Sequence, residues 1–164
     1  MKIAPVISAA LEIVLLVVGT GLVGHFMKEL HDDYDKQDES YNLGFYGRHE
    51  FYLFSTSLGV IIAICSIVEA ITGILEKKGG VLVMAVVHAL WAFQLVVATA
   101  LLAKVLTTYE DKGDLPISLC DVYDKSDKDY QCSELIGGVA CGFIAAVIFI
   151  IDAVLYIILP SEQK

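Results

Sequence analysis

Residues 135–159 read LIGGVACGFIAAVIFIIDAVLYIIL, a run of 25 residues with a single charged side chain, Asp152. About 20 mostly apolar residues suffice to cross roughly 30 Å of hydrocarbon, because a helix rises about 1.5 Å per residue. The run is therefore long enough to form a helix that spans a membrane.

Three more segments of this kind precede it, so the sequence predicts four spans. The chain of 164 residues is 57% hydrophobic, which is too apolar for a soluble domain of this size. The first segment follows Lys2 as a secretory signal would, but it is long and carries Glu12 near its middle, so we expect it to remain as a span. We predict one all-α domain, residues 1–164, folded as a four-helix transmembrane bundle: spans 3–26, 51–75, 81–106 and 135–159, loops 27–50 and 107–134, turn 76–80 and tail 160–164.

The net charge of −9 lies entirely in the two long loops. Residues 27–50 hold seven acids against three bases, and residues 107–134 hold eight acids against three bases. The positive-inside rule counts basic residues only. The tails and the short turn hold more basic residues per unit length than the two long loops do. We therefore expect both termini and the short turn to be cytosolic and both long loops extracellular, on the strength of Lys2, Lys77, Lys78 and Lys164.

The four cysteines divide between loop and spans. Cys120 and Cys132 lie twelve residues apart in the second long loop, whereas Cys65 and Cys141 fall inside spans. In an oxidising compartment a pair of loop cysteines tends to form a disulfide, worth about 3 kcal/mol by loop-closure entropy. We predict a disulfide between Cys120 and Cys132, with two free thiols as the alternative.

Each span contains one ionisable residue well inside its apolar stretch. Counted from the predicted cytosolic ends, all four lie roughly 10 to 15 Å deep, so we expect them to form one intramembrane polar layer. A charge at mid-bilayer costs at least about 2.5 to 3.5 kcal/mol, which favours neutral groups that hydrogen-bond to one another. We interpret the layer as structural, holding the four helices in register. The alternatives are a proton or ion pathway and docking onto a partner's spans. The members of the layer are Glu12, Glu69, His88 and Asp152.

Glycines recur at helical spacing from the acids in three of the spans. Small residues mark the sides on which membrane helices pack closely, so we expect the acids to face the bundle interior and not lipid. Contact with a second copy or with a partner is the alternative use of such spacings. The glycines predicted to pack helices are Gly19, Gly73, Gly138 and Gly142.

The chain carries no catalytic motif that we recognise: a P-loop, a GxGxxG turn, a G-x-S-x-G elbow and an H-E-x-x-H helix are all absent. The acids of loop 27–50 lack the glycine and the closing glutamate of an EF-hand, so they predict a solvated loop, with a weak calcium site as the alternative. His31 and His49 are likewise expected at the surface instead of in a zinc site. We predict no enzymatic activity, no cofactor and no metal.

Three short motifs accompany the four-span layout: LEIVL at 11–15, KK at 77–78 and FIIDAVL at 149–155. Together with the layout, which covers nearly the whole chain, they resemble the MARVEL-type four-transmembrane family, and within it the small invertebrate, snakeskin-like tetraspans of smooth septate junctions. The Trp-Gly-Leu-Trp motif of claudins and the Cys-Cys-Gly motif of tetraspanins are absent. The resemblance implies membrane apposition, junction assembly or vesicle trafficking through lateral association with other membrane proteins.

We therefore predict a non-enzymatic tetraspan that acts as a structural scaffold or accessory subunit. We expect it in the plasma membrane at a cell junction or in a vesicle membrane, with its loops extracellular or lumenal. Its expected partners are the lipid bilayer and other integral membrane proteins, such as a channel, a pump or a junction complex. The sequence is compatible with a homo-oligomer, and nucleic acid is not expected as a partner. The alternative function is an auxiliary channel or transporter subunit, or a proton- or ion-conducting tetraspan that uses the polar layer.

Overall fold

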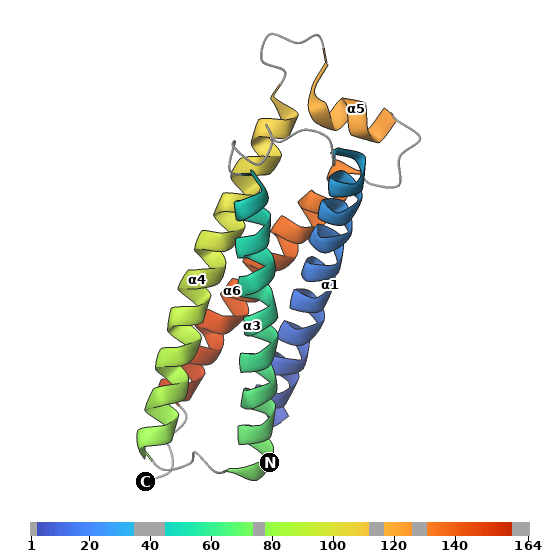
Figure 1. Ribbon diagram of the computed structural model, residues 1–164. Helices are drawn as coiled ribbons and strands as arrows, with labels where there is room; N and C mark the ends of the chain where they lie inside the picture. The colour runs from blue at the N-terminus through green and yellow to red at the C-terminus, as the bar shows by residue number, and fades with distance from the viewer. Residues whose placement is uncertain (1–2, 35–44, 74–77, 112–116, 126–130, 159–164) are drawn as a thin grey trace.

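All regular structure in the described part of the chain is helical. The computed structural model describes residues 3–34, 45–73, 78–111, 117–125 and 131–158 (Figure 1). These residues form four long helices and one short helix, which lies between the last two long helices in the sequence. In chain order they are α1 (Ile3–Tyr34), α3 (Phe45–Thr72), α4 (Lys78–Glu110), α5 (Leu119–Lys125) and α6 (Cys132–Ile158).

Each long helix contains a stretch that is long and apolar enough to cross a membrane. These stretches are Ala4–His31, Gly47–Thr72, Gly79–Glu110 and Cys132–Ile158. The prediction of an all-α bundle with four spans is confirmed. The helices also extend beyond the predicted spans; α1, for example, continues to Tyr34.

The four long helices form a closed ring. α1 packs against α3 and α6, and α4 packs against the same two helices from the other side. The start of α1 and the end of α6 lie at one end of the bundle, together with the end of α3 and the start of α4 (Figure 1). α5 lies across the opposite end (Figure 1). Which end faces the cytosol stays a prediction.

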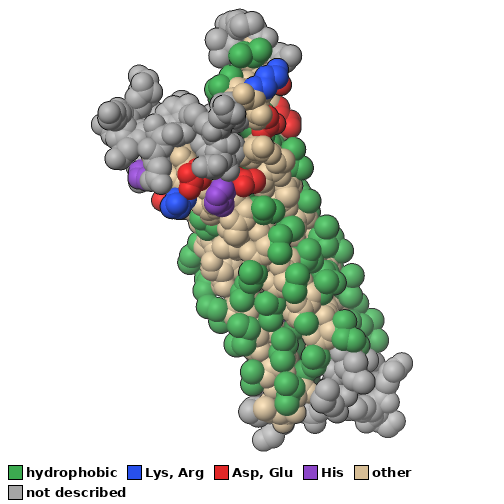
Figure 2. All heavy atoms as spheres, turned by 90° about the vertical axis from the view of Figure 1, so that its right-hand side faces the viewer, with side chains coloured by type: hydrophobic (Ala, Val, Ile, Leu, Met, Phe, Trp, Pro, Cys, Tyr) green, Lys and Arg blue, Asp and Glu red, His purple; other side chains and the backbone are tan. Residues whose placement is uncertain are grey.

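The outside of the bundle is apolar along most of its length. In the view of Figure 2, hydrophobic side chains cover the shaft and charged side chains gather near the end that carries α5. Large hydrophobic side chains are exposed on every long helix, as Val14, Phe54, Phe93 and Val147 illustrate. In water such a surface would be strongly unfavourable, so the bilayer is the solvent that it requires.

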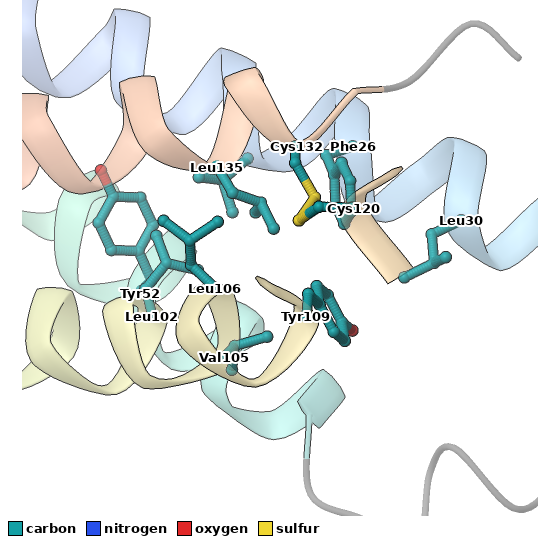
Figure 3. Close-up of a cluster of buried hydrophobic side chains, with 11 residues drawn as sticks. Phe26, Leu30, Tyr52, Leu102, Val105, Leu106, Tyr109, Cys120, Cys132 and Leu135 are labelled. Atoms are coloured by element: carbon teal, nitrogen blue, oxygen red, sulfur yellow. A yellow bond between two sulfur atoms is a disulfide. The ribbon is translucent and has the colours of Figure 1, made fainter. Parts of the chain in front are cut away.

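A buried cap closes the end of the bundle that carries α5. The Cys120–Cys132 disulfide joins α5 to the first residue of α6, and both half-cystines are buried (Figure 3). The Asp124 carboxylate accepts a hydrogen bond of 3.0 Å from the backbone N–H of Cys132, at the start of α6. The apolar side chains packed around this disulfide come from the four long helices: Val23, Phe26, Leu30, Tyr52, Leu102, Val105, Leu106, Tyr109 and Leu135.

His49 is buried, so the expectation that it lies at the surface was wrong. Its side chain is 1% exposed, and its ring stacks on Phe26 with the ring centroids 6.2 Å apart. The reason is that α3 begins at Phe45, before the predicted span, so His49 belongs to a helix face that packs against α1. His31 is exposed, as expected.

Glycines let three helices approach closely at the middle of the bundle. The Tyr52 hydroxyl donates a hydrogen bond of 2.6 Å to the backbone carbonyl of Gly138, which joins α3 to α6. A Cβ atom at Gly19 of α1 would lie 2.6 Å from the same hydroxyl. A Cβ atom at Gly142 would collide with Thr99 and crowd Tyr52. Backbone approach of this kind is the main use of small residues in membrane bundles.

Gly73 has a different role from the packing role expected for it. It follows the last residue of α3 with φ of 64°, a left-handed conformation that glycine adopts without strain. Its backbone N–H donates a hydrogen bond of 2.8 Å to the carbonyl of Glu69. Gly73 therefore terminates α3.

We predict that Gly142→Ala destabilises the bundle, whereas Gly21→Ala does not. A methyl group at Gly142 overpacks the contact with Thr99 and Tyr52, at a cost of about 1 to 3 kcal/mol, while nothing lies within 4 Å of a Cβ at Gly21. Both substitutions raise intrinsic helix propensity alike, so the comparison isolates packing. The measurement is unfolding of each variant in mixed detergent micelles; equal stabilities would contradict the close packing.

We also predict that Cys120 and Cys132 are protected from thiol reagents until reduced, and are then reached from outside the cell. An impermeant maleimide on intact cells, in a background of Cys65→Ser and Cys141→Ser, should label the chain only after reduction. Labelling before reduction would argue against the disulfide. Labelling that requires permeabilised cells would reverse the predicted orientation. Cys120→Ser should cost about 3 kcal/mol of stability by the loss of loop closure.

Candidate functional site: a polar cluster inside the bundle

Each long helix directs one ionisable side chain into the bundle. Glu12 of α1 and His88 of α4 are fully buried, and Asp152 of α6 and Glu69 of α3 are 3% and 6% exposed. Asp152 shares the buried face of α6 with Gly138, Gly142, Ala145 and Phe149, the face on which the sequence placed it. The side chains turn inward because hydrocarbon offers them no hydrogen-bond partner.

Three of the four groups converge at one point between α1, α4 and α6. One polar atom from each of Glu12, His88 and Asp152 lies within 4.8 Å of the other two. The Glu12 carboxyl lies beside Asp152, yet neither of its oxygens has a hydrogen bond of acceptable geometry to any described residue. The centre of the cluster is therefore an enclosed, incompletely satisfied set of oxygen and nitrogen atoms.

His88 is held from two sides, which sets its tautomer. Its Nδ1 lies 2.8 Å from the backbone carbonyl of Met84, and a carbonyl only accepts, so Nδ1 carries a proton. Its Nε2 lies 3.0 Å from the Ser66 hydroxyl of α3, which also lies 3.1 Å from the carbonyl of Ile62. In the neutral form of the ring, the lone pair therefore lies on Nε2. Phe149 packs against the ring, with centroids 5.3 Å apart.

Asp152 is anchored by Ser8 of α1. The Ser8 hydroxyl donates a hydrogen bond of 2.7 Å to Oδ1 of Asp152, across a sequence separation of 144 residues. This bond uses Oδ1 of Asp152 and not Oδ2. The start of α1 and the end of α6 are thereby tied together.

Glu69 lies beside the cluster instead of in it. It is absent from the group of three that converges, and its Oε2 accepts a hydrogen bond of 3.4 Å from the hydroxyl of Tyr156. The Tyr156 ring in turn lies against His88, with centroids 5.1 Å apart. The layer that the sequence predicted as one set of four groups is arranged as three convergent groups and one neighbour.

Hydroxyl side chains complete this site, and the sequence interpretation did not assign them a role. Ser8 lies four residues before Glu12, and Tyr156 lies four residues after Asp152, so each shares a helix face with an acid. Ser66 lies three residues before Glu69 and shares a helix face with it. Helical spacing from the acids was the signal that could have identified all three.

These contacts link the helices in pairs. Ser8 with Asp152 joins α1 to α6, Ser66 with His88 joins α3 to α4, and Tyr156 with Glu69 joins α6 to α3. Farther along the bundle, Thr20 and Thr56 share a hydrogen bond of 2.7 Å between α1 and α3. The cluster can therefore hold helix register, and its three convergent groups can also share protons or ligate an ion.

Comparison with known proteins gives one match. A family model described as MARVEL, a membrane-associating domain, matches residues 2–155. No curated protein and no solved structure matches the chain.

We predict that Ser8 and Asp152 are energetically coupled. In a double-mutant cycle, Ser8→Ala and Asp152→Ala should show a coupling free energy of about 0.6 to 1.7 kcal/mol, from the average to the largest value known for hydrogen bonds between membrane helices. The control pair is Ser8→Ala with Thr72→Ala, because Thr72 is exposed and bonds only within its own helix, to Val68. That pair should be additive within about 0.5 kcal/mol. Additivity in both pairs would show that the bond does not hold the helices.

Proposed function

Because the chain belongs to the MARVEL family of membrane-associating domains, we propose that it is a non-catalytic scaffold or accessory subunit that binds other integral membrane proteins laterally. Its place, in this proposal, is a cell junction of the plasma membrane or a vesicle membrane. The four helices supply the contacts, and the loops face the outside or the lumen.

The observation that carries the proposal is the contrast between the inside and the outside of the bundle. The described ionisable groups deep in the spans are buried, whereas the outer faces carry large apolar side chains such as Phe93, which is 69% exposed. Apolar side chains alone give no drive to associate in lipid, so lateral binding relies on shape and close packing. Outer faces that mix bulky and small groups, as at Val14, Val18 and Gly21 of α1, offer such shape.

The cap provides a second surface for a partner. Leu119 and Val122 lie three residues apart on α5 and are both exposed, and Ile117 just before the helix is exposed too. Ser118 accepts a hydrogen bond of 3.1 Å from the backbone N–H of Asp121, which stabilises the start of α5. A short helix held by a disulfide presents these side chains at low conformational cost.

The convergence of Glu12, His88 and Asp152 favours a second candidate, a tetraspan or auxiliary channel subunit that conducts protons or ions through the cluster. A pathway requires these groups to exchange with water on both sides. Complete burial of Glu12 and His88 gives greater support to the scaffold.

We predict that photo-crosslinking from the outer faces captures other membrane proteins. A photoreactive residue at Phe93 or Val147 should give discrete protein adducts in native membranes. The matched controls are Leu95 and Phe149, which lie two residues further along the same helices and are fully buried. They should give only adducts within the chain.

An adduct at twice the mass of the chain would identify the lateral partner as a second copy. Lipid adducts alone at both outer positions, with no protein adduct, would contradict lateral binding through α4 and α6. Identification of the captured proteins by mass spectrometry distinguishes junction complexes from channels or pumps.

A further inference from the structure

We propose that Glu12, His88 and Asp152 bind one divalent transition-metal cation inside the bundle, with Zn²⁺ as the ion whose ligand preferences fit best. The starting point is the convergence of two carboxylates and one imidazole within 4.8 Å. These residues come from α1, α4 and α6, so the ion would join three helices. The site is independent of the lateral binding proposed above.

Glu12 supplies the second observation. Its side chain is fully buried, and both of its carboxyl oxygens lack a hydrogen-bond partner in the described part of the chain. A buried polar atom without a partner costs several kcal/mol in hydrocarbon, and native structures seldom tolerate two on one side chain. An ion at the point toward which Glu12, His88 and Asp152 converge would give both carboxyl oxygens of Glu12 a partner.

The surroundings prepare the other two ligands. His88 donates its Nδ1 proton to the carbonyl of Met84, so Nε2 is the ring nitrogen whose lone pair can bind a metal. A bond from the second ring nitrogen to a backbone carbonyl is the usual support of a metal-binding histidine. Ser8 bonds one oxygen of Asp152 and leaves the other available. Ser66, which faces Nε2, has the carbonyl of Ile62 as an alternative acceptor.

Charge and ligand type select the ion. Two carboxylates and a neutral imidazole around a divalent cation give a complex with no net charge, which lowers the cost of burial in a membrane. A monovalent cation would leave a net negative charge. Ca²⁺ and Mg²⁺ take oxygen ligands, whereas an imidazole nitrogen together with carboxylates is typical of Zn²⁺ sites.

The observed spacing requires a small adjustment. Tetrahedral ligands at about 2.0 to 2.2 Å from Zn²⁺ lie roughly 3.3 to 3.6 Å from one another. The three ligand atoms lie within 4.8 Å. We expect rotation of the Glu12 and Asp152 carboxyl groups to close this difference, which is at most about 1.5 Å. The ion would then lock the register of α1, α4 and α6.

The test is zinc binding by the full chain, purified in nanodiscs after treatment with a chelator. Added Zn²⁺ should bind at one ion per chain and raise the unfolding temperature. The background carries His25→Ala and His31→Ala, because both histidines are exposed and could bind zinc at the surface. Metal content and thermal unfolding are the two readouts.

Matched variants separate the site from its neighbours. Glu12→Gln and His88→Gln should abolish stoichiometric binding, and Ser8→Ala should weaken it by about 10- to 100-fold. Glu69→Gln, a buried acid outside the group of three, should leave affinity unchanged. Circular dichroism checks that each variant keeps its helices.

Should the variants of the site fail to fold, X-ray absorption at the zinc edge of the chain that carries only His25→Ala and His31→Ala still decides. A shell of nitrogen and oxygen at about 2.0 to 2.2 Å with a single imidazole supports the site. Sulfur in that shell, no stoichiometric binding by the folded chain, or equal affinity in Glu12→Gln overturns the proposal.

Discussion

A polar group in hydrocarbon must find its partner inside the protein, and this constraint shapes the whole bundle. A charged side chain at the centre of a membrane helix costs about 2.5 to 3.5 kcal/mol even on the mildest scale. Each long helix carries one such residue, so its rotation about its own axis is set by the need to turn that residue inward. Once Glu12, His88 and Asp152 face one another, the outward faces of α1, α4 and α6 are determined too.

The same constraint divides the bundle into layers along its axis. The polar cluster lies toward the end where α1 begins, and an apolar layer that includes Leu16, Leu95 and Phe149 follows it. Beyond that layer the Tyr52 hydroxyl donates a hydrogen bond to the carbonyl of Gly138. Glycines at this level let the helices come close enough for the contact. The cap with its disulfide closes the far end. Polar and apolar layers alternate, and the polar ones specify which helix lies beside which.

This organisation leaves the exterior of the bundle apolar along most of its length, as a lipid environment requires. In a membrane-associating MARVEL domain, a bundle whose deep ionisable groups turn inward can meet partners without exposing charge to lipid. In the scaffold that we propose, the buried cluster serves stability, and an ion bound there would make that stability depend on metal. The lateral contact and the ion binding that we propose use different parts of the molecule, the outer faces and the core.

The sequence by itself determined the four spans, the inward faces of the acids and the pairing of Cys120 with Cys132, because length, helical spacing and cysteine count are local properties. It did not reveal α5, the burial of His49 or the role of Gly73 in ending α3. Nor could spacing show that three of four ionisable groups meet while Glu69 lies beside them. Those outcomes depend on how the helices are rotated and shifted along their axes relative to one another. The hydrogen bond from Ser8 to Asp152, for example, joins residues 144 positions apart in the sequence. Only the packing of the four helices decides such distances, since no periodicity within one helix encodes its offset from another.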